Sequence, residues 1–594
     1  MVAEGGASLD GADSPPKRIA VWARRAERAA PWILLSIIPV LVLPVLLTKS
    51  MTADEYVHVA AGAFTLETGS FIPNWEQPPL VKLLAAWPLR WMGIVSGSAD
   101  PDDSSEVKEA YRKFWFENRI DHDAILFRAR LPMIPISMAL GALIYLWARS
   151  LYGSRGGTIS LAAYVFSPTI LGHTGLVTTD VAGAAGFLLA LRLFWGACQT
   201  PSAVRFLLMG GSMGLAVLCK FSGLLLVPVM IVFLIGSALR ARFGSEEHKL
   251  EIHRYLPRGG AGRKASLRAV GIVLAAAFVI TWAGYAFETA PLSRKARLPK
   301  NKKLAVLIYT NPALRKAYQF VGEKMPVPIP SFFRGLDRLR KHNRHGHHAF
   351  FLGERSKKGW LTYFPVAFIL KTSLPLLLLL GIAGITWWTG KGKRPAAESL
   401  LLVAAVTYLL IAMTSGINIG VRHILVFYVV LFVLLGRLAT LSLHRWKWMG
   451  IALGLLLGWH AVEAIRISPH YLAYFQPLTG GPSQGYRYLV DSNLDWGQDL
   501  QNLARDLEQR DSPEVWLAYF GSLDPSIYGI KYKPLPPDEE VEGWVVISAS
   551  ALQLGVVVKG GRVGSGDAFA WLRKHEPFDS VGHSILYYQI PVRK

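Results

Sequence analysis

Three acidic side chains lie close to the ends of hydrophobic segments of the sequence. Asp54 and Glu55 occur in "MTADEYVHVAAG", a few residues after an apolar run, with His58 one helical turn further on, and Asp180 occurs in "LVTTDVAG". An ionisable group at the mouth of a membrane helix is costly unless it faces water, a cavity or a counter-ion. Such a carboxylate could act as a general base. It could equally cap a helix, because Thr and Asp are favoured at helix starts.

Basic side chains lie at comparable places in other apolar segments: Arg128 and Arg130 in "LFRARLP", Lys220 in "CKFSG", Lys371 in "FILKTSLP", and Arg422 with His423 in "NIGVRHIL". Any one of them could reach to the bilayer surface or pair with a helix end. Arg422 is the strongest candidate, because it stands beside Asn418 and His423 at the end of an apolar helix. A guanidinium group binds phosphate through two parallel hydrogen bonds and stabilises a departing phosphate.

The segment "NWEQPPLVKLLAAWPL" predicts a short helix at the membrane interface, with Glu76 and Lys82 at head-group level; a plain loop anchor is the alternative. The histidine-rich run from Lys341 to His348 could suggest a metal site, but it has no carboxylates at ligand spacing, so a polar loop is favoured. Motifs for nucleotide hydrolysis, dinucleotide binding and serine hydrolysis do not occur in their expected contexts. Cys198 and Cys219 offer neither a disulfide framework nor a cysteine zinc site.

The composition is that of an integral membrane protein. Of the 594 residues, 52% are hydrophobic and 18% charged, which is too apolar for a soluble protein of several domains. The first apolar run follows a basic segment, but it exceeds a signal-peptide core and lacks a small-x-small site, so it predicts an uncleaved span. We expect about eleven spans. They lie at 31–48, 131–149, 157–173, 176–197, 204–220, 222–239, 269–287, 361–387, 398–414, 422–441 and 448–465.

Lysine and arginine crowd the segments 17–28, 240–268, 391–394 and 445–447. Alternate crossings put all four on one side, which is the cytoplasm by the positive-inside rule. We therefore expect a multi-pass protein of the cytoplasmic (inner) membrane, with a cytoplasmic N-terminus and the acids on the outer face. The basic stretch from "TAPLSRKARLPKNKK" to "GERSKKGW" falls outside in this count. It is either a solvated loop or a surface for anionic lipid or phosphate groups.

The hydrophobic runs stop at about Ser468, and a segment of soluble character follows. The stretch "DSNLDWGQDLQNLARDLEQR" contains a helix with one apolar face, and "EVWLAYFG", "GWVVISAS" and "SILYYQI" predict strands. Asp491 and Trp496 in this stretch could recognise a sugar or acceptor, or could dock the segment on the membrane part. We expect a cytoplasmic tail at 1–30, a multi-span domain at 31–467 with outer loops 50–130 and 288–360, and a soluble extracytoplasmic α/β domain at 468–594.

Taken together, an outer acidic pair after the first span, "PPLVKLL" after it and "TTD" at the fourth span resemble the GT-C membrane glycosyltransferases. The closest resemblance is to glycosyltransferase family 39, which includes protein O-mannosyltransferases and lipid A aminoarabinose transferases. The C-terminal "ISPHYLAYFQPLTGGP" and "YLVDSNLDWGQDL" are similar to uncharacterised bacterial members. The resemblance implies a polytopic α-helical GT-C fold, and it maps the family's catalytic acid to Asp54 and its second acid to Asp180. Gln77 replaces the lysine that follows Glu76 in the aminoarabinose enzymes, so their donor or metal contact does not carry over.

Activated nucleotide sugars are not expected outside the membrane, so an outer transferase needs a donor whose phosphate is carried by a lipid. The sequence thus predicts transfer of a hexose or pentose from a polyprenyl-phosphate donor to a hydroxyl of a lipid, glycan or protein, with inversion. Asp54 would be the base, with Glu55 and Asp180 as orienting acids. The candidate substrate-binding residues are Arg422, Arg128, Lys371, Glu76, Lys82, His58 and His423. No cofactor is expected, a metal is not supported, and the partners are the donor, the acceptor and membrane lipids rather than nucleic acid.

Two other classes of protein stay open at this stage. A transporter or lipid flippase would also concentrate charges inside helices, but would be expected to show inverted repeats and broken helices near the bilayer midplane. A membrane scaffold with a C-terminal binding domain would leave the acids as helix caps. The gathering of polar residues at one face favours transfer over both.

Overall fold

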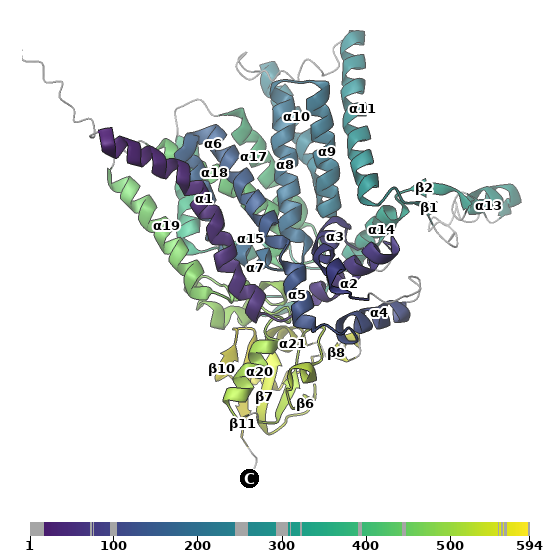
Figure 1. Cartoon of the computed structure of the whole chain (residues 1–594), viewed down its shortest axis with the longest axis vertical. Helices are drawn as coiled ribbons and strands as arrows, with labels where there is room; N and C mark the ends of the chain where they lie inside the picture. Colours follow the sequence, from purple (N-terminus) through teal and green to yellow (C-terminus); the bar gives the residue numbers. More distant parts are fainter. Residues whose placement is uncertain are drawn as a thin grey trace, which may run out of the picture.

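The computed structural model describes residues 17–71, 74, 76–95, 104–243, 259–292, 307–308, 310–320, 324–389, 395–441, 447–511, 513–555, 558–559, 562–563 and 567–591. Within them the chain is a polytopic helical membrane protein with a mixed α/β region at one end of its helices (Figure 1). We call this end of the helix bundle the domain-side end. The basic segment 391–394 lies outside the described residues, as do most of 240–268 and 445–447 and a smaller part of the predicted outer loop 288–360.

Eight helical segments in the described ranges are long and apolar enough to cross a membrane, or nine if one bent pair is counted as a span. They comprise α1 (Lys17–Thr48), α5 (His122–Arg130) with α6 (Met133–Val165), α8 (Thr179–Gln199), η3 (Phe221–Leu225) with α10 (Leu226–Phe243), α11 (Gly259–Gly284), α17 (Ala396–Met413), η7 (Val421–Ile424) with α18 (Leu425–Leu435) and η8 (Gly436–Thr440), and α19 (Lys447–Ile467). The bent pair is α15 (Tyr363–Lys371) and α16 (Leu374–Thr389), which meet at 114°.

The helix α6 is a hairpin of two antiparallel arms. Its chain reverses at Gly153, where φ is 78° and ψ is 179°, a left-handed conformation that glycine adopts without steric cost. Tyr164 Oη donates a hydrogen bond to the carbonyl of Ser137 at 2.9 Å, and Gly157 packs directly on Tyr145. Contacts between residues so placed require the two arms to run side by side in opposite directions. The arms correspond to the predicted spans 131–149 and 157–173.

Two further segments account for the rest of the difference from eleven. The predicted span 204–220 is α9 (Ala203–Cys219), which at 17 residues is slightly shorter than a full span. The predicted span 361–387 is the bent pair α15 and α16. The fold class expected from the sequence is therefore confirmed, and the count differs because some spans are short, bent or joined.

Short helices cover the domain-side end. They are α2 (Ala53–Thr68), α3 (Leu80–Ala86), η2 (Trp87–Met92), α4 (Ser104–Phe116), α7 (Pro168–Thr174), α13 (Pro312–Gln319) and α14 (Pro330–His345). Two antiparallel strand pairs accompany them, β1 (Thr289–Pro291) with β2 (Pro326–Pro328) and β3 (Ala349–Phe351) with β4 (Glu354–Ser356). The predicted helix after the paired prolines is α3 and η2. Its Trp87 and Trp91 are exposed, as expected of a helix at a bilayer interface.

The α/β region contains a five-stranded mixed sheet in the order β10-β11-β7-β5-β6. The pairs of β5 with β6 and with β7 are parallel, and the other two are antiparallel. The helix α20 (Leu500–Gln509) buries Leu500, Leu503 and Leu507, its predicted apolar face. The strands of this sheet are β5 (Val515–Ala518), β6 (Tyr532–Pro534), β7 (Gly543–Ser548), β10 (Asp579–Val581) and β11 (Ile585–Ile590). A separate pair is formed by β8 (Val558–Lys559) and β9 (Arg562–Val563). The helix α21 (Ala549–Leu554) follows β7.

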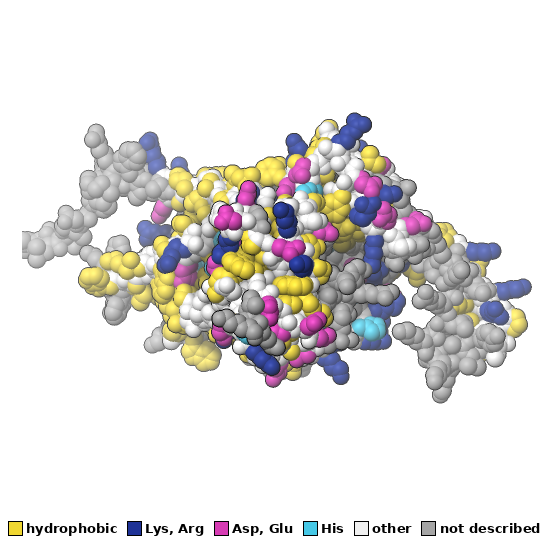
Figure 2. All heavy atoms as spheres, turned by 90° about the horizontal axis from the view of Figure 1, so that it is seen from below, with side chains coloured by type: hydrophobic (Ala, Val, Ile, Leu, Met, Phe, Trp, Pro, Cys, Tyr) yellow, Lys and Arg dark blue, Asp and Glu magenta, His cyan; other side chains and the backbone are white. Residues whose placement is uncertain are grey.

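The surface at this end carries many charged side chains. Figure 2, seen from the side of the α/β region, shows acidic and basic side chains scattered over the face between hydrophobic side chains and uncharged polar groups. Such a mixture suits contact with water rather than with lipid.

The 3-10 turns that join α19 to the sheet and run within the region are η9 (Tyr471–Ala473), η10 (Pro477–Thr479), η11 (Pro482–Arg487), η12 (Asp491–Asn493), η13 (Pro525–Tyr528) and η14 (Leu572–Lys574).

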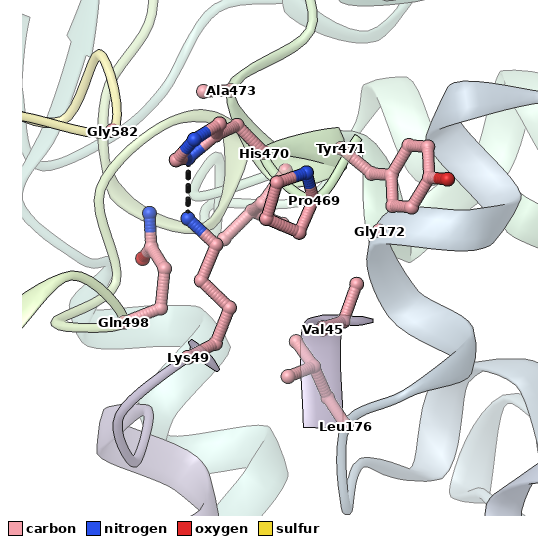
Figure 3. A pocket seen from close by; sticks show the side chains of 11 residues that line it. Val45, Lys49, Gly172, Leu176, Pro469, His470, Tyr471, Ala473, Gln498 and Gly582 are labelled. Carbon is pink, nitrogen blue, oxygen red and sulfur yellow. Dashed lines mark hydrogen bonds between the residues drawn. The ribbon is translucent and has the colours of Figure 1, made fainter. Parts of the chain in front are cut away.

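A buried polar junction fastens the α/β region to the end of α1. Lys49 Nζ donates to His470 Nδ1 at 2.6 Å (Figure 3). The same ammonium group forms an ion pair with Asp499. Burial, followed by the neighbouring Lys49 charge, lowers the pKa of His470 to about 4. The imidazole is therefore neutral, and its Nδ1 can accept a hydrogen bond from the Lys49 ammonium group. Because these groups are desolvated, the junction fixes the region firmly relative to the helices.

Candidate functional site

Arg422 lies between the two acids that the sequence singled out. Its Nη1 donates to Asp54 Oδ2 at 2.7 Å and lies 3.6 Å from Asp180 Oδ2. Lys220 Nζ contacts Asp180 Oδ1 at 2.5 Å. The side chain of Asp54 is 30% exposed, whereas that of Asp180 is only 1% exposed. Two acids and two cations thus form one cluster, in which Asp54 is the acid that solvent can reach.

Four separate chain segments bring this cluster together. Asp54 lies in the first turn of α2 and Asp180 in the first turn of α8, where the positive end of a helix favours a carboxylate. Lys220 is the extended residue that ends α9, and Arg422 lies in the 3-10 turn that opens α18. The predicted convergence of Asp54, Asp180 and Arg422 is therefore observed, and Lys220 joins them. Lys220 carried the same sequence signal as Arg422, a cation at the end of an apolar segment.

Glu55 is not directed into this cluster. Its carboxylate, which is fully buried, accepts hydrogen bonds from Arg130 at 2.7 and 2.8 Å and from the backbone N–H groups of Thr52 and Val177 at 3.0 Å. Burial pushes the pKa of Glu55 upward, but the Arg130 charge and these hydrogen bonds outweigh it, so the pKa lies below its ordinary value. Glu55 thus caps α2 and ties it to α5 and to the loop before α8. The structure supports a positioning part for Glu55 rather than contact with a substrate.

The α/β region contributes directly to the site. The Arg422 guanidinium lies 4.1 Å from the centre of the Trp496 ring, within cation–π range. Val421 N donates to Asn493 Oδ1 at 2.9 Å, so the turn that carries Arg422 rests on the same segment. The sequence left recognition and docking open for this stretch. The structure shows that it docks against η7 and, in doing so, supplies one wall of the cluster.

Asp491 adds a third carboxylate close to Arg422. It is buried and adopts a left-handed backbone conformation with φ of 57°, which Asp tolerates better than most residues. Burial raises the pKa of Asp491 to about 6, against the lowering effect of Arg422. Its charge therefore changes within the physiological range of pH, next to the guanidinium group.

Histidines surround the cluster. In the described part of the chain, His173 Nδ1 and His423 Nε2 are buried without a hydrogen-bond partner. Burial lowers the pKa of His173 to about 3. His58 Nδ1 instead contacts the backbone carbonyl of Val177 at 2.9 Å, which holds α2 against the loop before α8. His58 thus packs α2 against that loop.

Two of the predicted cations lie away from the cluster. Arg128 is exposed and contacts Met92 Sδ at 3.6 Å, while the next arginine, Arg130, is the buried one. Lys371 Nζ donates to the carbonyls of Leu472 at 2.8 Å and Asn493 at 2.5 Å. Lys371 therefore ties the bent pair to the α/β region, and its location does not support a direct phosphate contact.

Glu76 and Lys82 also have other partners. Glu76 forms an exposed ion pair with Arg338 of α14. Lys82 Nζ donates to the carbonyls of Asn74 at 2.6 Å and Gln77 at 2.8 Å, and burial lowers its pKa to about 7. Lys82 thereby holds the loop before α3 in place.

The histidine-rich run does not form a metal centre in this structure. His342 Nε2 lies 3.1 Å from His347 Nδ1 at the end of α14. Among the residues that the structure describes, no group of three or more His, Cys, Asp or Glu side chains is arranged to hold a metal ion.

Residues 116–252 match the family model of the dolichyl-phosphate-mannose-protein mannosyltransferases. The match covers less than half of the chain, and it indicates a membrane glycosyltransferase. The matched segment of the glycosyltransferase contains Asp180 and Lys220, whereas Asp54 and Arg422 lie outside it. No curated protein matches the glycosyltransferase.

Solved structures similar to the glycosyltransferase include three from different organisms. ArnT from Cupriavidus metallidurans, bound to undecaprenyl phosphate, has a TM-score of 0.46 and 13% identity, covering 92% of this chain and 97% of that one. The Pmt1-Pmt2 complex of S. cerevisiae, bound to the sugar donor, has a TM-score of 0.46 and 11% identity, covering 84% of this chain and 94% of that one. The Archaeoglobus fulgidus oligosaccharyltransferase, tethered to an acceptor peptide, has a TM-score of 0.44 and 14% identity, covering 87% of this chain and 62% of that one. These values are too low to transfer any detail of a site.

Proposed function

We propose that this glycosyltransferase moves a sugar from a polyprenyl-phosphate donor to an acceptor hydroxyl, with inversion at the anomeric carbon. The observation that carries the proposal is the placement of Arg422 between Asp54 and Asp180, at the end of the helices where the α/β region lies. A cation held beside an accessible carboxylate provides both functions that the reaction needs. One group takes a proton and the other stabilises a departing phosphate.

Exposure and partners favour Asp54 as the base. Asp180 is enclosed and lies against both Lys220 and Arg422, so its carboxylate is committed to neutralising two cations. Asp54 accepts a hydrogen bond from Arg422, and nearly a third of its side chain is exposed. An acceptor hydroxyl can therefore approach Asp54 but not Asp180.

The chemical step is a single displacement. The acceptor oxygen attacks the anomeric carbon while its proton passes to the Asp54 carboxylate. The bond between the anomeric carbon and the phosphate oxygen breaks, and its electron pair leaves with the polyprenyl phosphate. Arg422 stabilises the charge that develops on that phosphate, because a guanidinium group presents paired donors to phosphate oxygens.

The same guanidinium serves both acids in the structure, and this couples donor binding to activation of the base. A phosphate oxygen that binds Arg422 competes with Asp54 for Nη1. Donor binding would weaken the ion pair and leave the carboxylate more basic and more available to the acceptor. Lys220 keeps Asp180 neutralised during this exchange.

The orientation of the protein forms part of the proposal. The site and the α/β region share one end of the helices, and the basic segments 17–28 and 240–268 belong to the other end by the sequence count. The positive-inside rule then places the site on the outer face of the cytoplasmic membrane. A lipid-carried donor and an acceptor of the cell envelope, whether lipid, glycan or protein, can both reach this face.

The test is a transfer assay in proteoliposomes with a set of polyprenyl-phosphate sugars and envelope acceptors. Asp54→Asn should lower turnover by at least about 100-fold, the usual size of a general-base contribution, while donor binding persists. A folded Asp54→Asn protein that retains near wild-type turnover would contradict the role of Asp54.

Asp337→Asn provides the matched control. Asp337 is an exposed acid at the same end of the molecule that pairs with Lys341 of α14. The same change from acid to amide there removes an ion pair outside the cluster, so transfer should remain at the wild-type rate. Equal losses in both variants would point to a general surface-charge effect instead of a base.

A further inference from the structure

A second basic site lies at the end of the helices opposite the cluster. A cavity of about 390 Å³ opens between the last turns of α8 and the first turns of α9, lined by Arg192, Trp195, Gly196, Arg205 and Leu208 among others. Arg192 stands twelve residues after Asp180 on the same helix, which corresponds to about 18 Å along its axis. The cavity is therefore separate from the catalytic cluster.

The two guanidinium groups converge on one point. A Cβ atom at Gly196 would lie 3.9 Å from Arg192 Nη1 and 3.9 Å from Arg205 Nη1. Arg205 Nη1 donates to the Gly196 carbonyl at 2.6 Å, which holds that side chain across the connection between the helices. The absence of a side chain at Gly196 leaves the space between the two cations open.

No carboxylate within the described ranges lies at ion-pair distance from Arg192 or Arg205. The buried acid of α8, Asp180, is already bound to Lys220 at the other end of the helix. Two neighbouring positive charges repel each other, and the cost rises at a bilayer boundary where water is scarce. The first turn of α9 adds the positive end of its helix dipole at the same place. The arrangement lacks a negative charge.

Apart from Gln199, the remaining side chains that line the cavity are apolar. Leu208 is 51% exposed on the side of α9, and Leu193 and Trp195 of α8 are half-buried. Tryptophan is typical of the boundary between lipid chains and head groups. A soluble anion would gain nothing from these side chains, whereas an acyl chain beneath a head group would cover them.

We propose that this cavity binds the phosphate head group of an anionic phospholipid, in the leaflet opposite the catalytic face. Arg192 and Arg205 hold the phosphate from two sides, and Leu193, Trp195 and Leu208 contact the upper part of an acyl chain. The site is independent of the transfer reaction, because none of these residues contacts Asp54, Asp180 or Arg422.

The test measures lipid binding to the full-length protein by native mass spectrometry after removal of co-purified lipid. Phosphatidylglycerol should bind at one tight site, at least tenfold more tightly than phosphatidylcholine. The double variant R192Q/R205Q should lose that preference, and photoreactive phosphatidylglycerol should label the segment 192–208 in the wild type only. Equal phosphatidylglycerol affinity in wild type and double variant would overturn the proposal.

Two further variants separate charge from folding. Arg149→Gln removes an exposed arginine of the α6 hairpin outside the cavity and should leave the tight site unchanged. The pair R192K/R205K keeps both charges but loses the paired donors, so binding should be intermediate. If Arg149→Gln weakens binding as much as the double variant does, the attraction is a diffuse surface effect and the proposal fails. If inorganic phosphate competes as well as the lipid does, the cavity holds a free anion and the lipid assignment is overturned.

Discussion

Adjacent residues of α2 have different environments because of helix geometry. Consecutive helical side chains point about 100° apart, so Asp54 and Glu55 cannot face the same surroundings. Asp54 faces the open side and Arg422, whereas Glu55 faces inward to Arg130. The carboxylate with no exposed surface can maintain the framework, and the one that solvent reaches can exchange a proton. The charge pair that looked like a single feature in the sequence therefore performs two separate tasks.

At the residue scale, Glu55→Gln should destabilise the protein in a pH-dependent way. Replacing one partner of a buried pair leaves Arg130 with a weaker acceptor and should cost about 3 kcal/mol at pH 7. The pKa of Glu55 is lowered in the folded protein, so its contribution is fully present above the ordinary glutamate value of 4.5 and is lost as pH falls through the folded pKa. Unfolding temperatures in detergent should therefore differ between wild type and variant at pH 7 and converge well below pH 4.5.

Glu109→Gln is the control for this measurement. Glu109 pairs with Arg112 on the exposed surface of α4, where solvent screens the interaction. The unfolding temperature of the Glu109→Gln variant should stay close to that of the wild type at every pH. A Glu55→Gln difference that remained constant below pH 4.5 would show that packing, rather than charge, sets its contribution.

At the element scale, the α6 hairpin determines how the helices around the site can pack. Its two arms approach each other closely because Gly141 and Gly157 have no side chains to hold them apart. Gly156 in turn lets the hairpin approach the backbone of Gly436 in η8. Close approach of backbones through small residues is a common way for membrane helices to associate. The second arm leads through α7 to the loop before α8, so its position governs where Asp180 enters the cluster.

Gly157→Ala should separate the two arms. The added Cβ would lie 2.8 Å from a ring carbon of Tyr145 and 2.9 Å from its carbonyl oxygen, so the backbone must shift. We expect a loss of about 1–3 kcal/mol in stability, as for overpacked cores, measured as a lower unfolding temperature in detergent. Gly271→Ala in α11, where nothing lies within 4 Å, should be neutral or slightly stabilising. Equal effects at the two positions would contradict close packing at Gly157.

At the scale of the whole molecule, the α/β region and the helices form one functional unit. The junction of Lys49, His470 and Asp499 fixes their relative position, and the segment from Asp491 to Trp496 then meets Arg422. An element far away in the sequence thereby sets the electrostatic field at the site. Part of that field changes with pH, because burial raises the pKa of Asp491 to about 6.

Asp491 should make donor affinity depend on pH. Below pH 6 it is neutral and Arg422 attracts phosphate more strongly, while above pH 6 its negative charge offsets part of that attraction. Affinity for a sugar phosphodiester, which does not titrate in this range, should fall roughly three- to tenfold from pH 5 to pH 7.5, equivalent to about 1 kcal/mol. Asp491→Asn should keep the higher affinity throughout, as measured by isothermal titration in nanodiscs. A wild-type affinity that stays constant over this range would rule out the electrostatic role of Asp491.

The sequence by itself determined the features that depend on local composition. Apolar length set the membrane segments, and acids or cations at their ends marked Asp54, Asp180 and Arg422, because a charge next to a long apolar run must be placed at a surface or a site. The tertiary structure decided the features that depend on direction and distance. It turned Glu55 toward Arg130, kept Arg128 and Lys371 away from the cluster, joined two predicted spans into a hairpin and brought Trp496 under Arg422. These outcomes follow from side-chain packing between segments that lie tens of residues or more apart in the sequence, which periodicity and composition do not encode.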